Sequence, residues 1–253
     1  MTTLVYDGSF SGWLTAVFEI YEHRFRDASI QPRHSYQDEL LHQRQDVITD
    51  EKKSGRVLKG LSERVSRAGL KKLYQAFLSE EKNIENVLLQ FVQYTFSSKV
   101  TVEYDYGNAS VLKVQQMAKT VHREKHRMEA FVRFQLTKDN LFYSIVQPDF
   151  NVLPLIRTHF KDRYADQRWL IYDARRRYGI YYDLHEVTEI TIDFSESLNT
   201  DGGSVYDENE EMYQQLWQQY FSSVNIKSRK NTKLHIQHMP KRYWKYLTEK
   251  QVF

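Results

Sequence analysis

The spacing of apolar residues changes near residue 130, and this change largely decides which fold the chain can adopt. After Ala109 the apolar side chains recur every three to four residues, at Val114, Met117, Ala118, Val121 and Met128. That period predicts a helix with one buried face. From residue 130 to residue 136 the period becomes two, because Ala130, Val132, Phe134 and Leu136 alternate with their neighbours. The sequence therefore predicts a helix that leads into a strand.

A hairpin and a second helix are expected next. The alternating segment 130–136 and LFYSIVQ (141–147) flank the turn-prone sequence TKDN, so the two predict a β-hairpin. The sequence NVLPLIRTHFKDRY (151–164) predicts a helix, because Pro154 is tolerated in a first helical turn.

A second hairpin completes the expected sheet. The segments RWLIYD (168–173) and YGIYYD (178–183) flank the turn ARRR (174–177), and EVTEITIDF (186–194) is expected to add one more strand. The predicted class is α+β, with an antiparallel sheet of two hairpins and an intervening helix in a ββαββ-like order.

The N-terminal part of the chain is expected to be mostly helical. LVYD (4–7) predicts a short strand, and Gly8 with Ser9 predicts a turn and an N-cap before a helix. Residues 26–50 are polar and contain Pro32, so they are interpreted as a long connection. Further helical patterns are VLKGLSERV (57–65), AGLKKLYQAFL (68–78) and NIENVLLQFVQYTF (83–96).

Three regions follow from these patterns. Residues 1–108 form the mostly helical region, residues 109–198 the α+β region, and residues 199–253 a loop, a short helix and a basic helical tail. The loop is expected at NTDGGS (199–204) and the short helix at EEMYQQLWQQYFSSV (210–224). A single compact domain that includes all three regions is the alternative.

Composition excludes several kinds of chemistry. The chain contains no cysteine, so disulfides, thiol catalysis, thiolate zinc sites and iron–sulfur clusters are all excluded. We expect no cofactor, and any redox chemistry would belong to a partner. No apolar run is long enough for a membrane span and no export signal is visible, so the expected compartment is the cytoplasm and no membrane partner is expected.

Charge is strongly partitioned in the C-terminal third of the chain. Residues 178–226 contain no lysine or arginine and ten acidic residues, whereas residues 227–250 contain eight basic residues and only Glu249 as an acid. Such asymmetry predicts an anionic partner for the basic segments, with mutual pairing of the two segments as the alternative.

The sequence VHREKHRMEAFVRF (121–134) contains the first group of candidate residues. His122 and His126 lie four residues apart, but two ligands do not make a metal site, and we expect no metal there. Beside them runs a basic row that could neutralise successive phosphates. A salt-bridge lattice with Glu124 and Glu129 is the competing interpretation. The DNA-contact candidates here are Lys119, His122, Arg123, His126 and Arg127.

The turn of the second hairpin contains three adjacent arginines, Arg175, Arg176 and Arg177. Three adjacent guanidinium groups repel one another unless an acid or an anion lies among them, and Asp173 offsets only part of this charge. A hairpin of this kind can reach into a DNA groove while Tyr178 stacks on a base. A solvated turn above core tyrosines is the alternative.

The C-terminal tail combines basic and aromatic residues, which suits a nucleic acid whose bases stack and whose phosphates pair. Docking of the tail on the acidic segment is the alternative. The candidates are Lys230, Lys241, Arg242, Tyr243 and Trp244.

Catalytic motifs are not recognisable in the sequence. A nucleophile elbow, a phosphate-binding glycine loop and a dinucleotide fingerprint are all missing. Glu189 and Asp193 could hold a magnesium ion, but no lysine motif of a nuclease accompanies them. The catalytic residues, if the chain is an enzyme, are unknown at this point.

Four segments together resemble one family of DNA-metabolism proteins of undefined biochemical activity. They are YDGSFSGWLTAVFEIYE, VHREKHRMEAFVRF, DQRWLIYDARRRYGIYYD and MPKRYWKYLTE. The resemblance implies a partnership with a radical-SAM protein of DNA modification or repair. In some bacteria the domain is fused to a uracil-DNA-glycosylase-like domain, which has no counterpart in this sequence.

The resulting hypothesis is an accessory protein of DNA repair or modification that binds DNA and a radical-SAM partner. Two alternatives remain open. One is an enzyme that acts directly on DNA, as a nuclease or in base processing, through an unrecognised site. The other is a protein-interaction scaffold without DNA contact.

Overall fold

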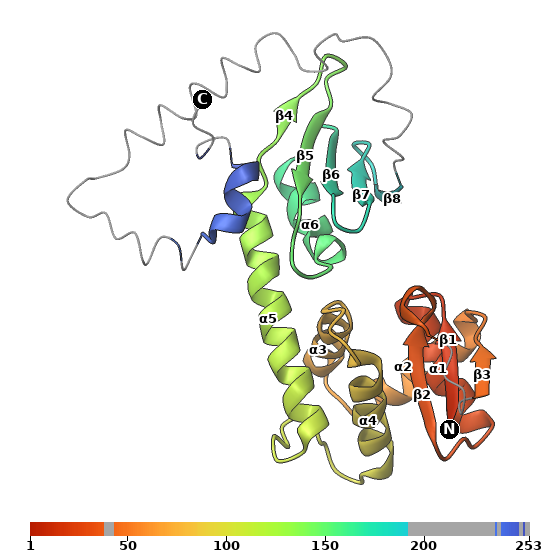
Figure 1. Cartoon of the computed structure of the whole chain (residues 1–253). Helices are drawn as coiled ribbons and strands as arrows, with labels where there is room; N and C mark the ends of the chain where they lie inside the picture. Colours follow the sequence, from red (N-terminus) through yellow and green to blue (C-terminus); the bar gives the residue numbers. More distant parts are fainter. Residues whose placement is uncertain (38–42, 192–235, 237–238, 248–249, 251–253) are drawn as a thin grey trace. The chain divides into compact units, whose positions relative to one another are not determined.

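The residues that the computed structural model describes are 1–37, 43–191, 236, 239–247 and 250 (Figure 1). The chain divides into two compact units, Met1–His122 and Arg123–Phe253, and each is described by itself. The expected loop at 199–204, the expected helix at 210–224 and the candidate Lys230 lie outside the described residues. None of the described helices is long and apolar enough to cross a membrane. The protein is α+β, as predicted.

The first unit contains a parallel three-stranded sheet in the order β2-β1-β3. Strand β1 (Thr2–Tyr6) is central and almost entirely buried, and it pairs with β2 (Ala28–Pro32) and β3 (Gln43–Asp46). The interpretation of residues 26–50 as a connection is therefore wrong. Both missed strands lie at sheet edges, and β3 has the polar sequence QRQD, because an edge strand that stays largely exposed needs no apolar alternation.

Helices supply the rest of the first unit, and each overlaps its predicted segment, although α2 begins and ends earlier than the expected 57–65. Helix α1 (Phe10–Glu22) starts where expected, because Gly8 adopts a φ of 90° and the Ser9 hydroxyl accepts a hydrogen bond from the backbone of Gly12. The helices that follow are α2 (Glu51–Ser62), α3 (Arg67–Phe77) and α4 (Ile84–Ser97). The Asn86 side chain fixes α4 to the sheet by bonding both the backbone N–H and the carbonyl of Ile30.

Helix α5 (Ala109–Phe131) starts in the first unit and ends in the second. Its start is confirmed, but the strand expected over residues 130–136 is mostly wrong, because strand β4 is limited to Gln135–Leu136. The helix extends into the alternating segment only as far as Phe131, and residues 132–134 are irregular. The Arg133 guanidinium donates to the carbonyls of Ala130 and Val132, where the helix ends. Carbonyls in the last turn of a helix have no partner within the helix, so a local cation favours the helical ending.

The second unit is built on a five-stranded sheet in the order β4-β5-β6-β7-β8. After β4, its strands are β5 (Phe142–Val146), β6 (Trp169–Asp173), β7 (Tyr178–Tyr182) and β8 (Val187–Ile190). Both predicted hairpins are confirmed, since β4 with β5 and β6 with β7 are antiparallel pairs. The sheet is nevertheless mixed, because β5 and β6 are parallel.

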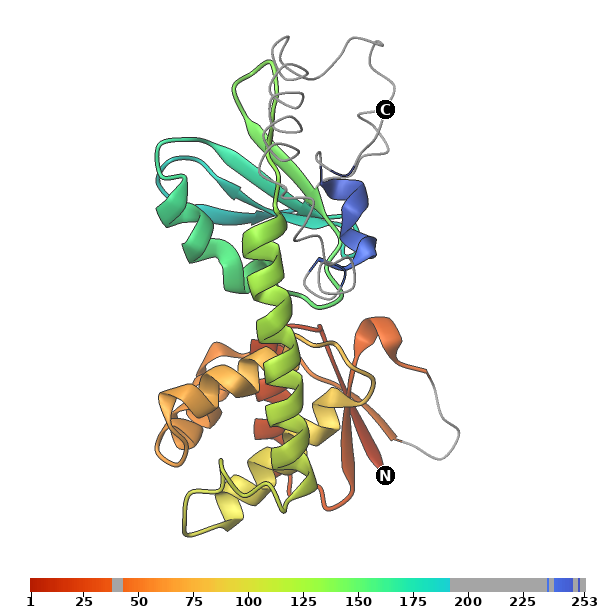
Figure 2. The ribbon, with the colours of Figure 1, turned by 90° about the vertical axis from the view of Figure 1, so that its left-hand side faces the viewer.

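The parallel pair follows from the predicted helix α6 (Leu153–Arg163), which connects β5 to β6. A crossover helix returns the chain to the end of the sheet where the previous strand began, so the next strand runs in the same direction. Figure 2 shows α6 lying along the sheet. Its Phe160 side chain packs edge-on against the fully buried Trp169 of β6, with the ring centroids 6.1 Å apart. This aromatic contact anchors the core of the second unit.

Candidate nucleic-acid interface

The loop between β5 and α6, residues 147–151, is the place where three predicted basic segments meet. Side chains from the C-terminal half of α5, from the arginine turn 174–177 and from the short helix η4 (Lys241–Tyr246) all contact this loop or its immediate neighbours. All of these residues belong to the second unit. The fold therefore gathers segments that lie up to 119 residues apart in the sequence.

Asp173 is the acid that the run of three arginines requires. Its carboxylate is fully buried and accepts hydrogen bonds from the backbone N–H groups of Arg175 and Arg176, at 2.8 and 3.2 Å. The Arg176 guanidinium also forms an ion pair with it at 2.8 Å, and only 10% of the Arg176 side chain is exposed. Further bonds from Arg176 reach the carbonyls of Pro148 (3.2 Å) and Asp149 (3.1 Å). Arg176 therefore holds the loop in place and is not displayed to solvent.

The other two arginines of the turn are exposed. Arg175 donates one bond of 2.7 Å to the Asp149 carbonyl, which leaves most of its guanidinium at the surface. Arg177 adopts a φ of 58°, a left-handed conformation that closes the tight turn, and its side chain is exposed. Tyr178 is not available for stacking in this arrangement, because its hydroxyl donates to Asn151 and burial raises its pKa.

Glu124 is the central acid of the α5 side. Its carboxylate is buried and accepts hydrogen bonds from the backbone N–H of Asp149 (2.9 Å) and from the hydroxyl of Tyr243. Two arginines contribute charge, Arg127 at 3.3 Å and Arg242 at 3.5 Å. Two cations and two neutral donors therefore surround this buried carboxylate, which compensates for the loss of its hydration.

Helix η4 docks on this acid through Tyr243 and on the loop through its neighbours. Burial, followed by the Glu124 carboxylate, raises the pKa of the Tyr243 hydroxyl, which is therefore a permanent donor. The exposed Asp149 carboxylate pairs with Arg242 at 2.6 Å. Lys245 and the Tyr246 hydroxyl both donate to the Gln147 side-chain oxygen, at 2.6 and 2.9 Å.

The remaining aromatic side chain of η4 has basic neighbours. The ammonium groups of Lys241 and Lys250 lie 5.9 and 5.3 Å from the ring centroid of Trp244, and the Trp244 ring is partly exposed. A cation near an aromatic face that solvent can reach is the combination with which proteins bind phosphates and stack bases.

These contacts define a surface that we call the basic junction. Around the three carboxylates of Glu124, Asp149 and Asp173 it brings together more cations than these acids can neutralise. Its basic members are Arg127, Arg175, Arg176, Arg177, Lys241, Arg242 and Lys245. Glu124, Asp149 and Asp173 fix the positions of Arg127, Arg176 and Arg242, and the exposed Arg175, Arg177 and Lys241 can meet an anionic ligand.

The histidine row of α5 is organised mainly by acids. The Glu129 carboxylate lies 2.5 Å from the ammonium group of Lys125 and 3.1 Å from the Nδ1 atom of His126. The salt-bridge lattice considered for this segment therefore exists around Glu124 and Glu129. Lys119, His122 and Arg123 are exposed on the helix. Of the proposed magnesium pair, Glu189 is ion-paired with Arg157, and Asp193 lies outside the described residues.

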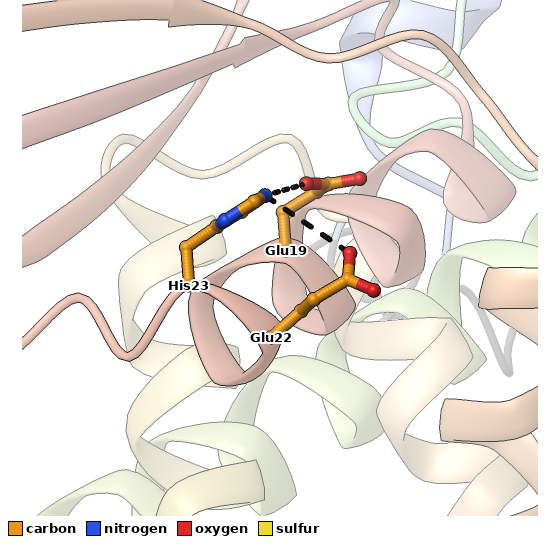
Figure 3. A group of neighbouring side chains, drawn as sticks. All are labelled: Glu19, Glu22 and His23. Atoms are coloured by element: carbon orange, nitrogen blue, oxygen red, sulfur yellow. Dashed lines mark hydrogen bonds and ion pairs between the residues drawn. The ribbon is translucent and has the colours of Figure 1, made fainter.

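A group with metal-ligand residue types lies elsewhere, at the end of α1 in the first unit. Figure 3 shows Glu19, Glu22 and His23 with their donor atoms turned toward one another. The ammonium group of Lys53 already pairs with both carboxylates, at 2.5 Å from Glu19 and 3.1 Å from Glu22. Because a lysine neutralises these acids, the group is explained as an ion-pair cluster that fastens α1 to α2.

The second unit is thus a mixed-sheet domain whose described surface displays a cluster of cations around a loop. Residues 82–249, about two thirds of the chain, match the model of a domain of unknown function, DUF4130. The protein belongs to this family. No curated protein and no solved structure is significantly similar to the chain.

Proposed function

We propose that the protein is an accessory factor of DNA repair or modification that binds DNA through the basic junction. The observation that supports this proposal most strongly is the convergence of the three basic segments on loop 147–151. Cations that served only solubility would have no reason to gather around one loop. A DNA backbone offers a dense row of negative charge that such a cluster can neutralise.

The buried acids support the same proposal. Glu124 and Asp173 keep Arg127 and Arg176 in fixed positions, so the exposed Arg175 and Lys241 project from a rigid base. A pre-organised cation loses less conformational entropy on binding a phosphate than a free one. Trp244 adds an aromatic surface for a splayed base.

A radical-SAM protein is the proposed partner. The resemblance of the sequence to DNA-metabolism proteins motivates this, and the absence of cysteine means that this chain cannot itself hold the iron–sulfur cluster of such an enzyme. The acidic segment around Glu208–Glu211 is the proposed contact, and it lies outside the described residues. Co-purification of the two folded proteins at micromolar concentration tests the pairing, and failure to co-purify would contradict it.

The test of DNA binding replaces exposed members of the basic junction and spares Arg176, which holds the fold. The triple variant Arg175→Gln, Arg177→Gln, Lys241→Gln removes up to three phosphate contacts. On duplex DNA the slope of log affinity against log salt should become shallower by roughly 2 to 3 units.

The matched control removes three exposed cations elsewhere, with Arg26→Gln, Lys82→Gln and Lys138→Gln. This control has the same change in net charge and should leave the slope almost unchanged. An equal change of slope in both variants would mean that DNA responds only to net charge, and the proposal would fail. Melting temperatures of both variants verify that the folds are intact.

A further inference from the structure

Helices α2 and α3 carry a second concentration of positive charge, in the first unit. Residues 51–77 contain eight basic residues and only two acids, Glu51 and Glu63. The two helices are joined by the four-residue turn Glu63–Ser66, and they lie outside the residues that match the family. The family match therefore assigns nothing to them.

The charges on α2 form one stripe. Lys52, Gly55, Arg56 and Lys59 follow one another at the i, i+3, i+4, i+7 spacing of a single helix face, and all four are exposed. The opposite face of the helix buries Ser54, Val57 and Leu61 in the core of the unit.

The cations of this stripe are not ion-paired within the described part of the chain. None of Lys52, Arg56 and Lys59 forms an ion pair with a described carboxylate, and Arg56 lies 4.9 Å from the Phe18 ring centroid. Lys53, one residue away on the flank, is fully occupied by Glu19 and Glu22. The fold thus neutralises Lys53 through two ion pairs. Of the stripe cations, Lys52 has the Asp50 carboxylate of the N-cap in its vicinity, whereas Arg56 and Lys59 have no ion pair in the described part of the chain.

Gly55, in the middle of the stripe, is not required by the fold. A glycine inside a helix lowers its stability relative to alanine. A Cβ atom built at Gly55 would meet no atom within 4 Å, so packing does not need the small residue, and the backbone has no positive φ there. At Gly60, in contrast, a Cβ atom would touch the Phe96 ring at 3.4 Å. The missing side chain at Gly55 leaves the helix backbone open to close approach from outside.

We infer that the α2 stripe is a second site for the sugar-phosphate backbone of DNA. From Lys52 to Lys59 the helix axis rises about 10 Å, at about 1.5 Å per residue, and one strand of a duplex presents about three phosphates over that length. Arg67 and Lys71 are further exposed cations on α3, the next helix along the chain. A protein partner would need apolar or aromatic anchors in the centre of its footprint, and the centre of the stripe is a glycine.

This inference rests on the proposed function, because it takes DNA as the ligand, and it assigns a separate surface to it. The first variant, Lys52→Gln with Arg56→Gln and Lys59→Gln, should make the salt slope on duplex DNA shallower by roughly 2 to 3 units. The control Arg26→Gln, Lys82→Gln, Lys138→Gln should not change it.

The second variant, Gly55→Gln, leaves the net charge unchanged and therefore tests whether DNA contacts this helix face directly. Its side chain fits the open space and favours the helix, so the melting temperature should rise, while DNA affinity falls severalfold with an unchanged salt slope. A purely structural glycine would give higher stability with unaltered affinity, and that result would overturn the inference.

The outcomes distinguish the two proposals. If the variant of the basic junction has a shallower slope and the α2 variants behave like the wild-type protein, the inference fails and the proposed function stands. If the wild-type protein does not bind DNA at all, both fail. If the α2 variants lose binding to a polyglutamate peptide as strongly as to DNA, the stripe is a site for acidic polypeptides and the inference is wrong.

Discussion

One glutamate in each unit is withdrawn from solvent, and the two have opposite surroundings. In the second unit the buried Glu124 has Arg127 and Arg242 within ion-pair distance and accepts two further hydrogen bonds. In the first unit the half-buried Glu85 accepts a bond of 3.3 Å from the Tyr6 hydroxyl, and it has no ion pair with any described lysine or arginine. Burial accordingly raises the pKa of Glu85.

The cations show the reverse distribution. In the second unit arginines are used to hold the loop 147–151 against buried acids, so their charge contributes to folding. In the first unit the lysines of the α2 stripe form no ion pair with a described carboxylate, and Glu85 forms none with a described lysine or arginine. Charges that a fold could pair and does not pair are candidates for ligand binding, whereas charges paired in the interior are part of the fold.

The largest effect is expected for Glu124→Gln. The substitution keeps the shape of the side chain and leaves Arg127 and Arg242 without their shared carboxylate, which should lower the free energy of unfolding of the second unit by about 3 kcal/mol. Urea denaturation, monitored through the hydrogen exchange of the amides in β5 to β7, measures this loss in the second unit.

The exposed Glu186 in the same unit provides the control, since Glu186→Gln should change stability by less than about 0.5 kcal/mol. A loss below about 1 kcal/mol for Glu124→Gln would show that the cluster is held by its neutral donors and by packing, and that the two units do not differ in the way described.

A smaller effect is expected within the arginine turn, where adjacent residues have different roles. Arg176→Gln removes the cation from the fully buried Asp173 and should cost about 2 kcal/mol, because a hydrogen bond to a charged group is lost. Arg177→Gln should cost less than about 0.5 kcal/mol and make the DNA salt slope shallower by about 1 unit. Equal stability losses in the two variants would contradict the assignment of Arg176 to the interior.

Much of this fold could be predicted from local patterns. The helices α2 to α6 and both hairpins follow from apolar period, caps and turn residues. Strand β3 was missed because an edge strand with the sequence QRQD carries no apolar period, and β2 (ASIQP) was missed because its Pro32 was interpreted as part of a connection. The end of α5 was placed too early, because an alternating segment can also continue a helix when Arg133 bonds the last carbonyls. Helix propensity and local bonds outweighed the period there.

The candidate site was only half predictable, for a related reason. A run of arginines is visible in any sequence, so the turn 175–177 and the tail were found. The acids that organise them were not, because their roles depend on contacts between distant segments. Glu124 is hydrogen-bonded to Asp149, which lies 25 residues away in the sequence, and to Tyr243, which lies 119 residues away. Such pairs cannot be recognised from local spacing in the sequence. Only the structure shows that Arg176 is paired with a buried acid whereas Arg177 is exposed.

The smallest effect, and the one with the opposite sign, is expected for Glu85→Gln. A carboxyl group whose pKa is higher in the folded state than in the unfolded state gives its full stabilisation below the unfolded pKa, and that stabilisation is lost as the pH rises through the folded pKa. Burial is the main cause of the raised pKa of Glu85, so the stabilisation that the protonated group gives at low pH is lost as the pH rises. Glutamine keeps an oxygen acceptor for Tyr6 and carries no charge.

The Glu85→Gln variant should therefore melt at a higher temperature than the wild-type protein at pH 7 and at the same temperature near pH 3. Thermal unfolding at both pH values measures this difference. If Glu85→Gln lowers the melting temperature at pH 7, as Glu124→Gln is expected to lower stability, the charge of Glu85 is compensated in the fold and the contrast between the two glutamates disappears.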